Sequence, residues 1–370
     1  MMLDEKSAFA RDGSAQFFDC PCIWQYLEKS PGPTVLYGMG DGADKVLQRL
    51  AERGITAAAV FASDEFVRGQ QFAGFTVEKY ADIRARLGDV TVLVCFGTER
   101  PEVIEHISAI AAEQQVLVPH VPLFGDALVD EGFVTEHRDE LLAADDIWAD
   151  AESRRVYRGY FRALWSGELA AMRSVESSRA DVWQILQPDA DEVFVDLGAY
   201  DGDTVREFLG QTGGRCRRVW AFEPDAKNFR KLTAAMEGDE RIRCLNMGVW
   251  QESGQLLFAG KAGRNSSLQF TAGGKGAMTD VISLDDWLTE YAAEPPTLLK
   301  FDVEGAEEAA LLGAQRLLAE YKPKLQVAAY HRSEDFFRLP LLIKRLNPEY
   351  RLYLRHHPYI PAWETNIYAV

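Results

Sequence analysis

The chain has 370 residues, enough for two domains of ordinary size, and its formal net charge is −17. A surface this acidic repels phosphate backbones and anionic lipids, so we expect neither nucleic acid nor a membrane as a partner. No apolar stretch reaches the roughly 18–20 residues that span a bilayer, and the polar residues 1–13 lack the apolar core of a signal peptide. We therefore expect a cytoplasmic protein.

The first third of the chain alternates short apolar runs with helical patterns. Strands are expected at 34–37, 57–61, 90–96 and 115–118. One helix follows the first strand, and a second is expected over 101–113, where Pro101 suits the first turn. Strands that alternate with helices predict a parallel sheet covered by helices. We expect a Rossmann-like accessory α/β domain over residues 1–135.

A glycine turn, Gly38-Met-Gly40-Asp-Gly42-Ala43, follows the first of these strands. Glycines between a strand and a helix at this spacing have the form of a dinucleotide-binding fingerprint. Asp64 lies near the end of the second strand, farther along the chain from the glycines than the ribose-binding acid of this fingerprint usually lies. A nucleotide or sugar-nucleotide site stays open, but we favour an accessory domain that places the substrate or forms dimer contacts.

Residues 136–187 carry apolar side chains at helical spacing and no strand-like run, which predicts a helical connector. The five cysteines are scattered and odd in number, which suits a reducing compartment. The single close pair, Cys20 and Cys22, has no second pair to complete a zinc site, so no metal is expected there.

From residue 188 to the C-terminus, the alternation of strands and helices returns. Strands are expected at 193–197, 218–222, 242–246, 297–302, 324–330, 350–354 and 366–370. Helices are expected at 204–210, 226–236, 283–291, 305–319 and 334–346. Ser283, with Asp286 three residues later, resembles an N-terminal capping pair.

Polar side chains gather where the strands of this second half end. They are Asp196, Glu223, Asn246 and Asp302. The carboxyl ends of strands in an open parallel sheet line one crevice, where ligands bind. Gly198 and Gly202 allow backbone angles and close approaches that a side chain would block. The backbone amides that open the helix near Thr204 could hold a carboxylate.

The charge of the glycine turn distinguishes between cofactors. The turn holds Asp196, Asp201 and Asp203, and so many negative charges suit a cation better than a pyrophosphate. S-adenosylmethionine carries an ammonium and a sulfonium, so the charges favour it over a nicotinamide dinucleotide, although spacing alone decides nothing. Glu223, at the end of the second strand, can bind both ribose hydroxyls.

Residues from about 192 to 370 resemble the FkbM family of S-adenosylmethionine-dependent methyltransferases. The matching segments are Phe194-Val-Asp-Leu-Gly-Ala-Tyr-Asp-Gly-Asp-Thr204, Ala221-Phe-Glu-Pro-Asp225 with Asn228, Asn246-Met-Gly248, Ser283-Leu-Asp-Asp286, Leu299-Lys-Phe-Asp-Val-Glu-Gly-Ala306 and Glu364-Thr-Asn-Ile-Tyr368. The resemblance implies a class I methyltransferase domain over 188–370, with a seven-stranded, mostly parallel sheet and one antiparallel strand near the C-terminus. It also implies O-methylation of a hydroxyl on a sugar, a glycan precursor or a natural product.

The resemblance implies which residues hold the cofactor. Carried across, Asp196, Gly198 and Gly202 would hold the methionine part, Glu223 would hold the ribose, and Asn246 would lie near the adenine. The other residues expected to bind the cofactor are Ala199, Tyr200, Asp201, Thr204, Pro224, Asn228, Gly248 and Asp302. Asp302 and Glu304 are expected where the acceptor meets the methyl group. Longer relatives that resemble this chain also carry an extra N-terminal α/β part.

The family pattern does not name a base for the acceptor hydroxyl. We nominate His331, just after the fifth strand of this half, because its ordinary pKa suits proton transfer near neutral pH. A structural histidine that bonds the end of the sheet is an equal alternative. Asp302 and Glu304 are the other catalytic candidates, and Glu304 could instead cap a helix from Gly305. The pair His356-His357 is expected in a solvated turn.

The favoured function is thus an S-adenosylmethionine-dependent O-methyltransferase that acts on a small-molecule or carbohydrate acceptor and forms a possible homo-oligomer. A nicotinamide-linked or sugar-nucleotide enzyme that uses the first domain is the second interpretation, and a non-catalytic nucleotide-binding scaffold is the third. Carboxylates collected at several strand ends argue against the scaffold.

Overall fold

The computed structural model describes residues 20–259, 267–268, 277–291 and 294–370. The polar residues 1–13 lie outside this part. The N-terminal sheet has the order β3-β4-β2-β1-β5-β6, and all of its pairs are parallel except β3 with β4. Its strands are β1 (Thr34–Tyr37), β2 (Ala57–Phe61), β3 (Gln71–Phe72), β4 (Phe75–Glu78), β5 (Thr91–Val94) and β6 (Gln115–Leu117). The four strands expected from the sequence are confirmed.

Helices accompany this sheet, as a parallel sheet requires when both of its faces are buried. They are α2 (Ile23–Lys29), α3 (Asp41–Glu52), η2 (Asp64–Phe66), α4 (Tyr80–Leu87) and α5 (Pro101–Ala111). The short hairpin of β3 and β4 was not expected from the sequence. Its two-residue turn places Ala73 and Gly74 at φ values of 49° and 86°, and an alanine there is a weaker hairpin signal than the Asn-Gly pair favoured in such turns.

The connector is helical, but it begins earlier than expected. Its helices are α6 (Glu131–Asp145), α7 (Ala151–Ser166), α8 (Leu169–Arg173) and α9 (Arg179–Leu186). Helix α6 starts at Glu131 because the Asp130 carboxylate accepts a hydrogen bond from the amide of Phe133. The connector packs on the C-terminal half, where Arg355 binds Asp150 and Asp181 at the N-terminal ends of α7 and α9.

The C-terminal sheet has seven strands in the order β16-β17-β15-β14-β7-β8-β9. They are β7 (Val193–Leu197), β8 (Arg218–Phe222), β9 (Ile242–Leu245), β14 (Leu298–Phe301), β15 (Lys324–Ala328), β16 (Leu352–His356) and β17 (Thr365–Ala369). Only β17 runs in the direction opposite to the other six strands. The antiparallel strand β17 lies between β15 and β16. This order confirms the expected class I methyltransferase fold. Strand β7 lies at the centre, between β14 and β8, and is fully buried.

The helices of this half are α10 (Asp203–Gln211), α11 (Ala226–Ala235), α12 (Leu284–Glu290), α13 (Glu307–Leu312), α14 (Gln315–Tyr321) and α15 (Asp335–Leu346). The single helix expected over 305–319 is two helices, α13 and α14. They are separated at Gly313, which lies so close to the backbone oxygen of Trp250 that a Cβ would collide with it. The expected cap is confirmed, because Ser283 Oγ accepts a hydrogen bond from the amide of Asp286.

A second, smaller sheet of this half was not expected. It has the order β10-β13-β11-β12, with β10 (Gly248–Val249), β11 (Gly254–Ala259), β12 (Ser267–Leu268) and β13 (Ala277–Ile282). None of the described helices is long and apolar enough to cross a membrane.

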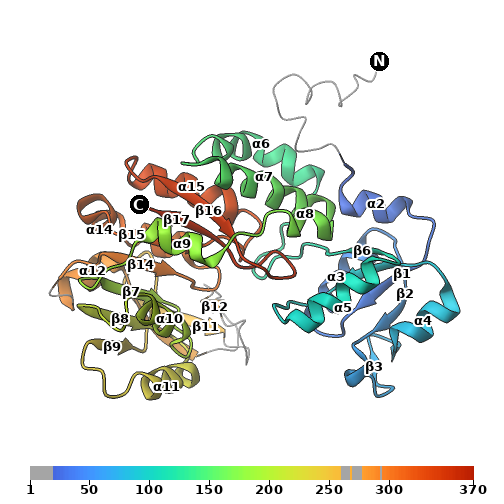
Figure 1. The fold of residues 1–370 in the computed structure, drawn as a ribbon, viewed down its shortest axis with the longest axis horizontal. Helices are drawn as coiled ribbons and strands as arrows, with labels where there is room; N and C mark the ends of the chain where they lie inside the picture. The colour runs from blue at the N-terminus through green and yellow to red at the C-terminus, as the bar shows by residue number, and fades with distance from the viewer. Residues whose placement is uncertain (1–19, 260–266, 269–276, 292–293) are drawn as a thin grey trace.

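The two halves of the chain are joined by direct contacts (Figure 1). Thr98, after β5, pairs with Ile360, between β16 and β17, through two backbone hydrogen bonds of 2.7 and 2.9 Å. Phe124, between the accessory sheet and the connector, packs against Gly305 and lies with its ring 5.8 Å from that of His331. The accessory sheet is therefore held against the end of the C-terminal sheet at which β14 and β15 finish.

Candidate active site

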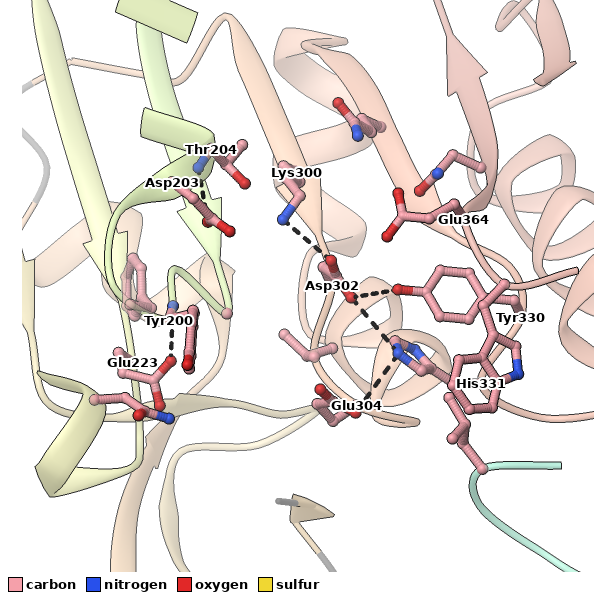
Figure 2. A pocket seen from close by; sticks show the side chains of 18 of the residues that line it. Tyr200, Asp203, Thr204, Glu223, Lys300, Asp302, Glu304, Tyr330, His331 and Glu364 are labelled. Carbon is pink, nitrogen blue, oxygen red and sulfur yellow. Dashed lines mark hydrogen bonds and ion pairs between the residues drawn. The ribbon is translucent and has the colours of Figure 1, made fainter. Parts of the chain in front are cut away.

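A cavity of about 550 Å³ opens at the carboxyl ends of β7, β8, β14 and β15. Its volume lies in the range of about 300–1,000 Å³ that is usual for small-molecule sites. The residues expected from the sequence that line it are Gly198, Tyr200, Thr204, Glu223, Pro224, Asn228, Gly248, Asp302, Glu304 and His331. Figure 2 shows Tyr200 and Glu223 on one side of this cavity and Asp302, Tyr330 and His331 on the other.

The turn after β7 brings the backbone close to neighbouring chain segments. Gly198 has a φ of 88°, and a Cβ on it would collide with the backbone oxygen of Asp302. Gly202 has a φ of 87° and forms the N-cap of α10. A Cβ there would collide with the side chain of Met236. The backbone angle favours glycine at both positions, and at Gly198 the close approach to a backbone oxygen also excludes a side chain.

Glu223, after β8, is held by the loops on either side of it. Its Oε2 accepts a 2.9 Å hydrogen bond from the amide of Tyr200, and its Oε1 accepts a 2.8 Å bond from the amide of Asp225. Burial raises the pKa of Glu223 to about 7, against the lowering effect of these amides. The carboxylate is thus fixed at the cavity wall, with acceptor capacity left for a ligand hydroxyl.

Asn246 supports this wall from behind rather than lining it. Its Nδ2 donates to the backbone oxygen of Glu223 at 2.8 Å and to that of Pro224 at 3.2 Å. The residues that follow it, Met247 and Gly248, do line the cavity. Asn246, which was expected near the adenine, thus contacts the loop that carries Glu223 and does not line the cavity itself.

Asp196 lies beneath the cavity instead of in its wall. Its side chain is fully buried, and neither carboxylate oxygen has a hydrogen-bond partner among the described residues. Lys300 Nζ lies 3.7 Å from Asp196 Oδ1 and 3.2 Å from Asp302 Oδ2. Burial raises the pKa of Asp196 to about 6, and the attraction of Lys300 limits the rise. Asp196, which was expected from the sequence to hold the cofactor, thus does not line the cavity, whereas its neighbour Lys300 does.

The other expected residues outside the cavity wall are Ala199, Asp201 and Gly202. Ala199 is buried in the core beside α10. Asp201 faces Arg206, which binds it at 2.9 Å. Asp203, the other carboxylate of the turn, does line the cavity. Of the three turn carboxylates, only Asp203 therefore lines the cavity, whereas the sequence pointed to Asp196 together with Asp201 or Asp203.

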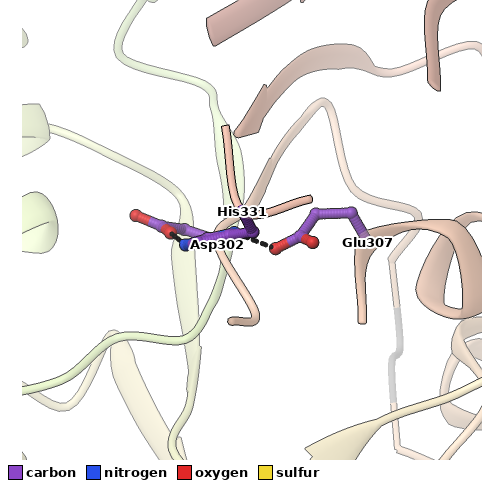
Figure 3. Close-up of side chains that lie close together, drawn as sticks. All are labelled: Asp302, Glu307 and His331. Atoms are coloured by element: carbon purple, nitrogen blue, oxygen red, sulfur yellow. Dashed lines mark hydrogen bonds and ion pairs between the residues drawn. The ribbon is translucent and has the colours of Figure 1, made fainter. Parts of the chain in front are cut away.

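His331 lies between carboxylates (Figure 3). Its Nδ1 is 2.9 Å from Glu307 Oε1, and its Nε2 is 3.6 Å from Asp302 Oδ1 and 3.7 Å from Glu304 Oε2. Burial alone would lower the pKa of His331, but these carboxylates outweigh it and raise the pKa to about 10. The imidazole is therefore protonated near neutral pH and cannot accept a proton there, in contrast to the expectation from its ordinary pKa.

The two carboxylates that face His331 differ in their ionisation. Burial raises the pKa of Asp302, but Lys300 and His331 outweigh it and bring the pKa below the usual value. Burial raises the pKa of Glu304 to about 8. Glu304 does not cap a helix, because α13 begins at Glu307 with Ala306 as its N-cap.

Three non-glycine residues of the cavity wall have left-handed backbone. The φ values are 46° for Tyr200, 55° for Glu304 and 64° for Glu364. Such conformations cost about 1–3 kcal/mol each and concentrate at functional sites. Half of the six non-glycine residues with positive φ in the described chain line this one cavity, which supports a functional role for it.

Asp302, Glu307 and His331 each offer one atom within 4.8 Å of the others, as metal ligands do. However, the ring of His331 lies between the two carboxylates and turns one nitrogen toward each (Figure 3). A protonated imidazole satisfies both contacts, so the arrangement requires no metal ion.

Several residues of the site were not identified from the sequence. Glu307 was taken only as part of a helix, and Lys300 only as part of a matching segment. The accessory half supplies Glu99 and Leu123, and the loop between β16 and β17 supplies Tyr359, Trp363 and Glu364. The signal for Lys300 was its alternation with Asp302 along a strand, which puts both side chains on one face. Glu364 opens one of the matching segments, whereas Tyr359 and Trp363 carried no local signal.

The pair His356-His357 is another correction. Both residues are buried, at 0% and 3% exposure, rather than in a solvated turn. His356 Nδ1 lies 3.0 Å from Thr365 Oγ1, and His357 Nδ1 lies 3.2 Å from the backbone oxygen of Ser177. Strand β16 extends through His356, two residues beyond its expected end, and carries the pair into the core.

Strand order and cavity together define the C-terminal half as a class I methyltransferase domain. Residues 196–361 match the family model described as the methyltransferase FkbM domain. A crystal structure of methyltransferase FkbM from Methylobacillus flagellatus KT has a TM-score of 0.72 and 22% identity, and the match covers 99% of this chain and 97% of that one.

A curated relative, the 2-O-methyltransferase NoeI of Sinorhizobium fredii (strain NBRC 101917 / NGR234), is 24% identical over 148 residues. That match covers 35% of this chain and 60% of the relative's length. Residues 196–361 therefore match the FkbM methyltransferase family, and the resemblance noted in the sequence is confirmed.

Proposed function

We propose that the chain is an S-adenosylmethionine-dependent O-methyltransferase acting on a hydroxyl of a sugar, a glycan precursor or a related natural product. The observation that carries the proposal is a single cavity in the FkbM domain with Glu223 at one side and Asp302, Glu304 and His331 at the other. The similarity to a 2-O-methyltransferase supports oxygen as the methylated atom.

The residues of the cavity suit this cofactor. Glu223 would accept hydrogen bonds from ribose hydroxyls, with Pro224 and Asn228 beside it. Asp203 would attract the ammonium group, and Gly198, Tyr200 and Thr204 would line the methionine part. Gly248 would lie beside the adenine base of the cofactor. Asp196 would act through Lys300, which it anchors from below.

The acceptor hydroxyl would lie at Asp302 and Glu304. S-adenosylmethionine supplies an electrophilic methyl group whose bond to sulfur breaks, leaving its electron pair on sulfur, as the oxygen–methyl bond forms. The chain has to align the hydroxyl, exclude water and accept its proton. We assign the proton to Glu304, because its pKa of about 8 is nearer to neutral pH than that of Asp302. Asp302 would accept a hydrogen bond from the substrate that receives the methyl group.

His331 would hold these two carboxylates in place as an imidazolium. Glu307 fixes the ring through Nδ1, and Nε2 faces both Asp302 and Glu304. This role differs from that of the general base nominated from the sequence. Glu307 is itself held, because its Oε1 accepts a 2.8 Å hydrogen bond from the amide of Val303.

We also propose the domain limits expected from the sequence, with the connector extended to include α6 from Glu131. Residues up to about 130 would form the accessory domain, and 188–370 the catalytic domain. Binding of Arg355 to α7 and α9 supports a connector that belongs structurally to the catalytic half.

Titration calorimetry of the full chain with S-adenosylmethionine, S-adenosylhomocysteine and NAD tests the proposal. We expect binding of the first two and no heat with NAD. Binding of NAD alone would overturn the proposal, because the chemistry would then belong to a dinucleotide enzyme. A shift in melting temperature with the same ligands provides an independent readout.

A further inference from the structure

The cavity that Asp302 and Glu304 line is built from both halves of the chain. Glu99 and Leu123 come from the accessory half, and Tyr359 and Trp363 come from the loop between β16 and β17. The backbone pairing of Thr98 with Ile360 fixes these two segments side by side. An acceptor bound at Asp302 would therefore touch the accessory half as well.

The positive charges of the cavity wall are already engaged. Lys300 lies between Asp196 and Asp302, at 3.7 and 3.2 Å. His331 faces Glu307, Glu304 and Asp302. The third cation, Arg179, lies 3.8 Å from Glu207 and 3.8 Å from Glu364. Among the described residues that line the cavity, no cation is left without a carboxylate neighbour to balance an anionic acceptor.

The negative charges are in excess. Seven of the described lining residues carry carboxyl groups, against Arg179, Lys300 and His331 as cations. Five carboxyl groups remain even without Glu223 and Glu304, whose pKa values burial raises to about 7 and about 8. The exposed carboxylate of Glu99 has neither a hydrogen bond nor an ion pair within the part of the chain that the structure describes. A phosphate or carboxylate brought to this wall would be repelled, whereas a hydroxyl or an ammonium would find acceptors.

The wall also offers aromatic surface. The rings of Tyr359 and Trp363 lie 5.6 Å apart, tilted by 33°. Gly97 of the accessory half lies so close to Trp363 that a Cβ on it would collide with the indole. Trp363 is thereby fixed by the accessory half. A flat aromatic face beside hydrogen-bonding carboxylates suits a ring with an apolar face and polar edges.

We propose that the acceptor binds between the two halves of the chain, and that it is an uncharged or amino-bearing sugar unit rather than a phosphorylated or carboxylated one. The proposal rests on the proposed methyltransferase function and adds to it the charge of the substrate. Nucleotide-linked sugars are excluded from this subsite by the same repulsion. Glu99 sets the preference from the accessory side.

A set of methyl glycosides tests the proposal. Glucose, galactose, mannose and fucose would serve as parents, with the 2-amino derivative of each and the matched 6-phosphate or uronate where the sugar allows one. Release of S-adenosylhomocysteine from the full chain would be measured. We expect turnover of neutral or amino members, and kcat/KM at least about tenfold lower for their anionic counterparts.

Glu99→Lys, with Glu105→Lys as the control, tests the role of Glu99. Glu105 undergoes the same charge change on the exposed surface of α5 and does not line the cavity. We expect Glu99→Lys to raise KM for amino glycosides about fivefold or more relative to their neutral parents, and Glu105→Lys to leave that ratio unchanged. The dissociation constant of S-adenosylhomocysteine should not change in either variant.

The inference would be overturned if anionic glycosides were methylated as well as their neutral parents, or if no neutral or amino member reacted. It would also be overturned if both lysine variants changed the ratio equally. Failure of the methyltransferase function itself would appear differently, as an absence of S-adenosylmethionine binding in calorimetry.

Discussion

Glu223 offers the most direct test of cofactor binding at the level of a single residue. Its two carboxylate oxygens accept from Tyr200 and Asp225 and still face the cavity. Glu223→Gln replaces one acceptor oxygen with a donor, so one of the two amide contacts becomes a repulsion. We expect affinity for S-adenosylhomocysteine to fall at least about tenfold in calorimetry.

The control for this change is Glu237→Gln, on the exposed surface after α11. Glu237→Gln should leave the dissociation constant of S-adenosylhomocysteine unchanged. Equal affinity in Glu223→Gln and Glu237→Gln would remove Glu223 from the cofactor site.

Glu304 makes a prediction about pH. Because burial raises its pKa to about 8, Glu304 is protonated below that pH and cannot accept a proton from the acceptor. It becomes a carboxylate above that pH, so kcat should rise with pH through about 8. His331 stays charged in this range, since the carboxylates raise its pKa to about 10.

In Glu304→Gln, we expect the rise near pH 8 to vanish and kcat to fall about 10²-fold or more. The profile of kcat against pH, measured with a turned-over glycoside at saturating cofactor, provides the check. Asp302→Asn is the comparison, and it should lower the rate while retaining the rise. A Glu304→Gln profile that still rises near pH 8 would assign the base to another group.

At the scale of elements, the turn between β7 and α10 makes a prediction about stability. Gly198 combines a φ of 88° with a close approach to the backbone oxygen of Asp302. In Gly198→Ala, the added Cβ would force β7 and β14 apart at their carboxyl ends. We expect a loss of about 2 kcal/mol or more in the free energy of unfolding, because both the backbone angle and the contact oppose a side chain.

Gly210→Ala is the matched control, since Gly210 lies within α10 and a Cβ there would have no atom within 4 Å. Alanine stabilises a helix interior by about 0.5–1 kcal/mol relative to glycine. Urea unfolding should therefore move the two variants in opposite directions. A Gly198→Ala variant as stable as the unchanged chain would show that the turn tolerates a side chain.

On the scale of the whole molecule, Phe124 connects the accessory half to the catalytic machinery. Its buried ring packs on Gly305 and lies 5.8 Å from the ring of His331, and its amide donates to the backbone oxygen of His331. Phe124→Ala leaves a cavity at this contact. We expect a loss of about 3 kcal/mol in the free energy of unfolding, together with a lower kcat.

Phe66, whose side chain is 48% exposed, provides the control. Phe66→Ala should change the free energy of unfolding by less than about 0.5 kcal/mol. Phe124→Ala also removes a support of His331. Its effect on kcat is separated from its effect on stability by measuring kcat well below the melting temperature. Full activity in Phe124→Ala would mean that the accessory half is dispensable for the chemistry.

Local patterns in the sequence were sufficient for most of the strands and for the residues at their ends. The apolar run before Asp196, the glycines after it, and the acids Glu223 and Asp302 could be placed because backbone sterics and periodicity act within a few residues. The parallel sheet then follows, and with it the gathering of the strand ends in one crevice. By itself, the sequence also determined the acidic turn that favours a cationic cofactor.

The tertiary structure alone decided how these residues act. Asp196 is buried beside Lys300, His331 is charged because Glu307 and Glu304 surround it, and Glu99 from the far half of the chain lines the same cavity as Trp363. Burial and charge proximity join groups distant in sequence, and each pKa depends on all of the neighbours that folding brings together. No local pattern encodes such distances. The sequence could therefore nominate His331 but could not predict that its imidazole is protonated near neutral pH.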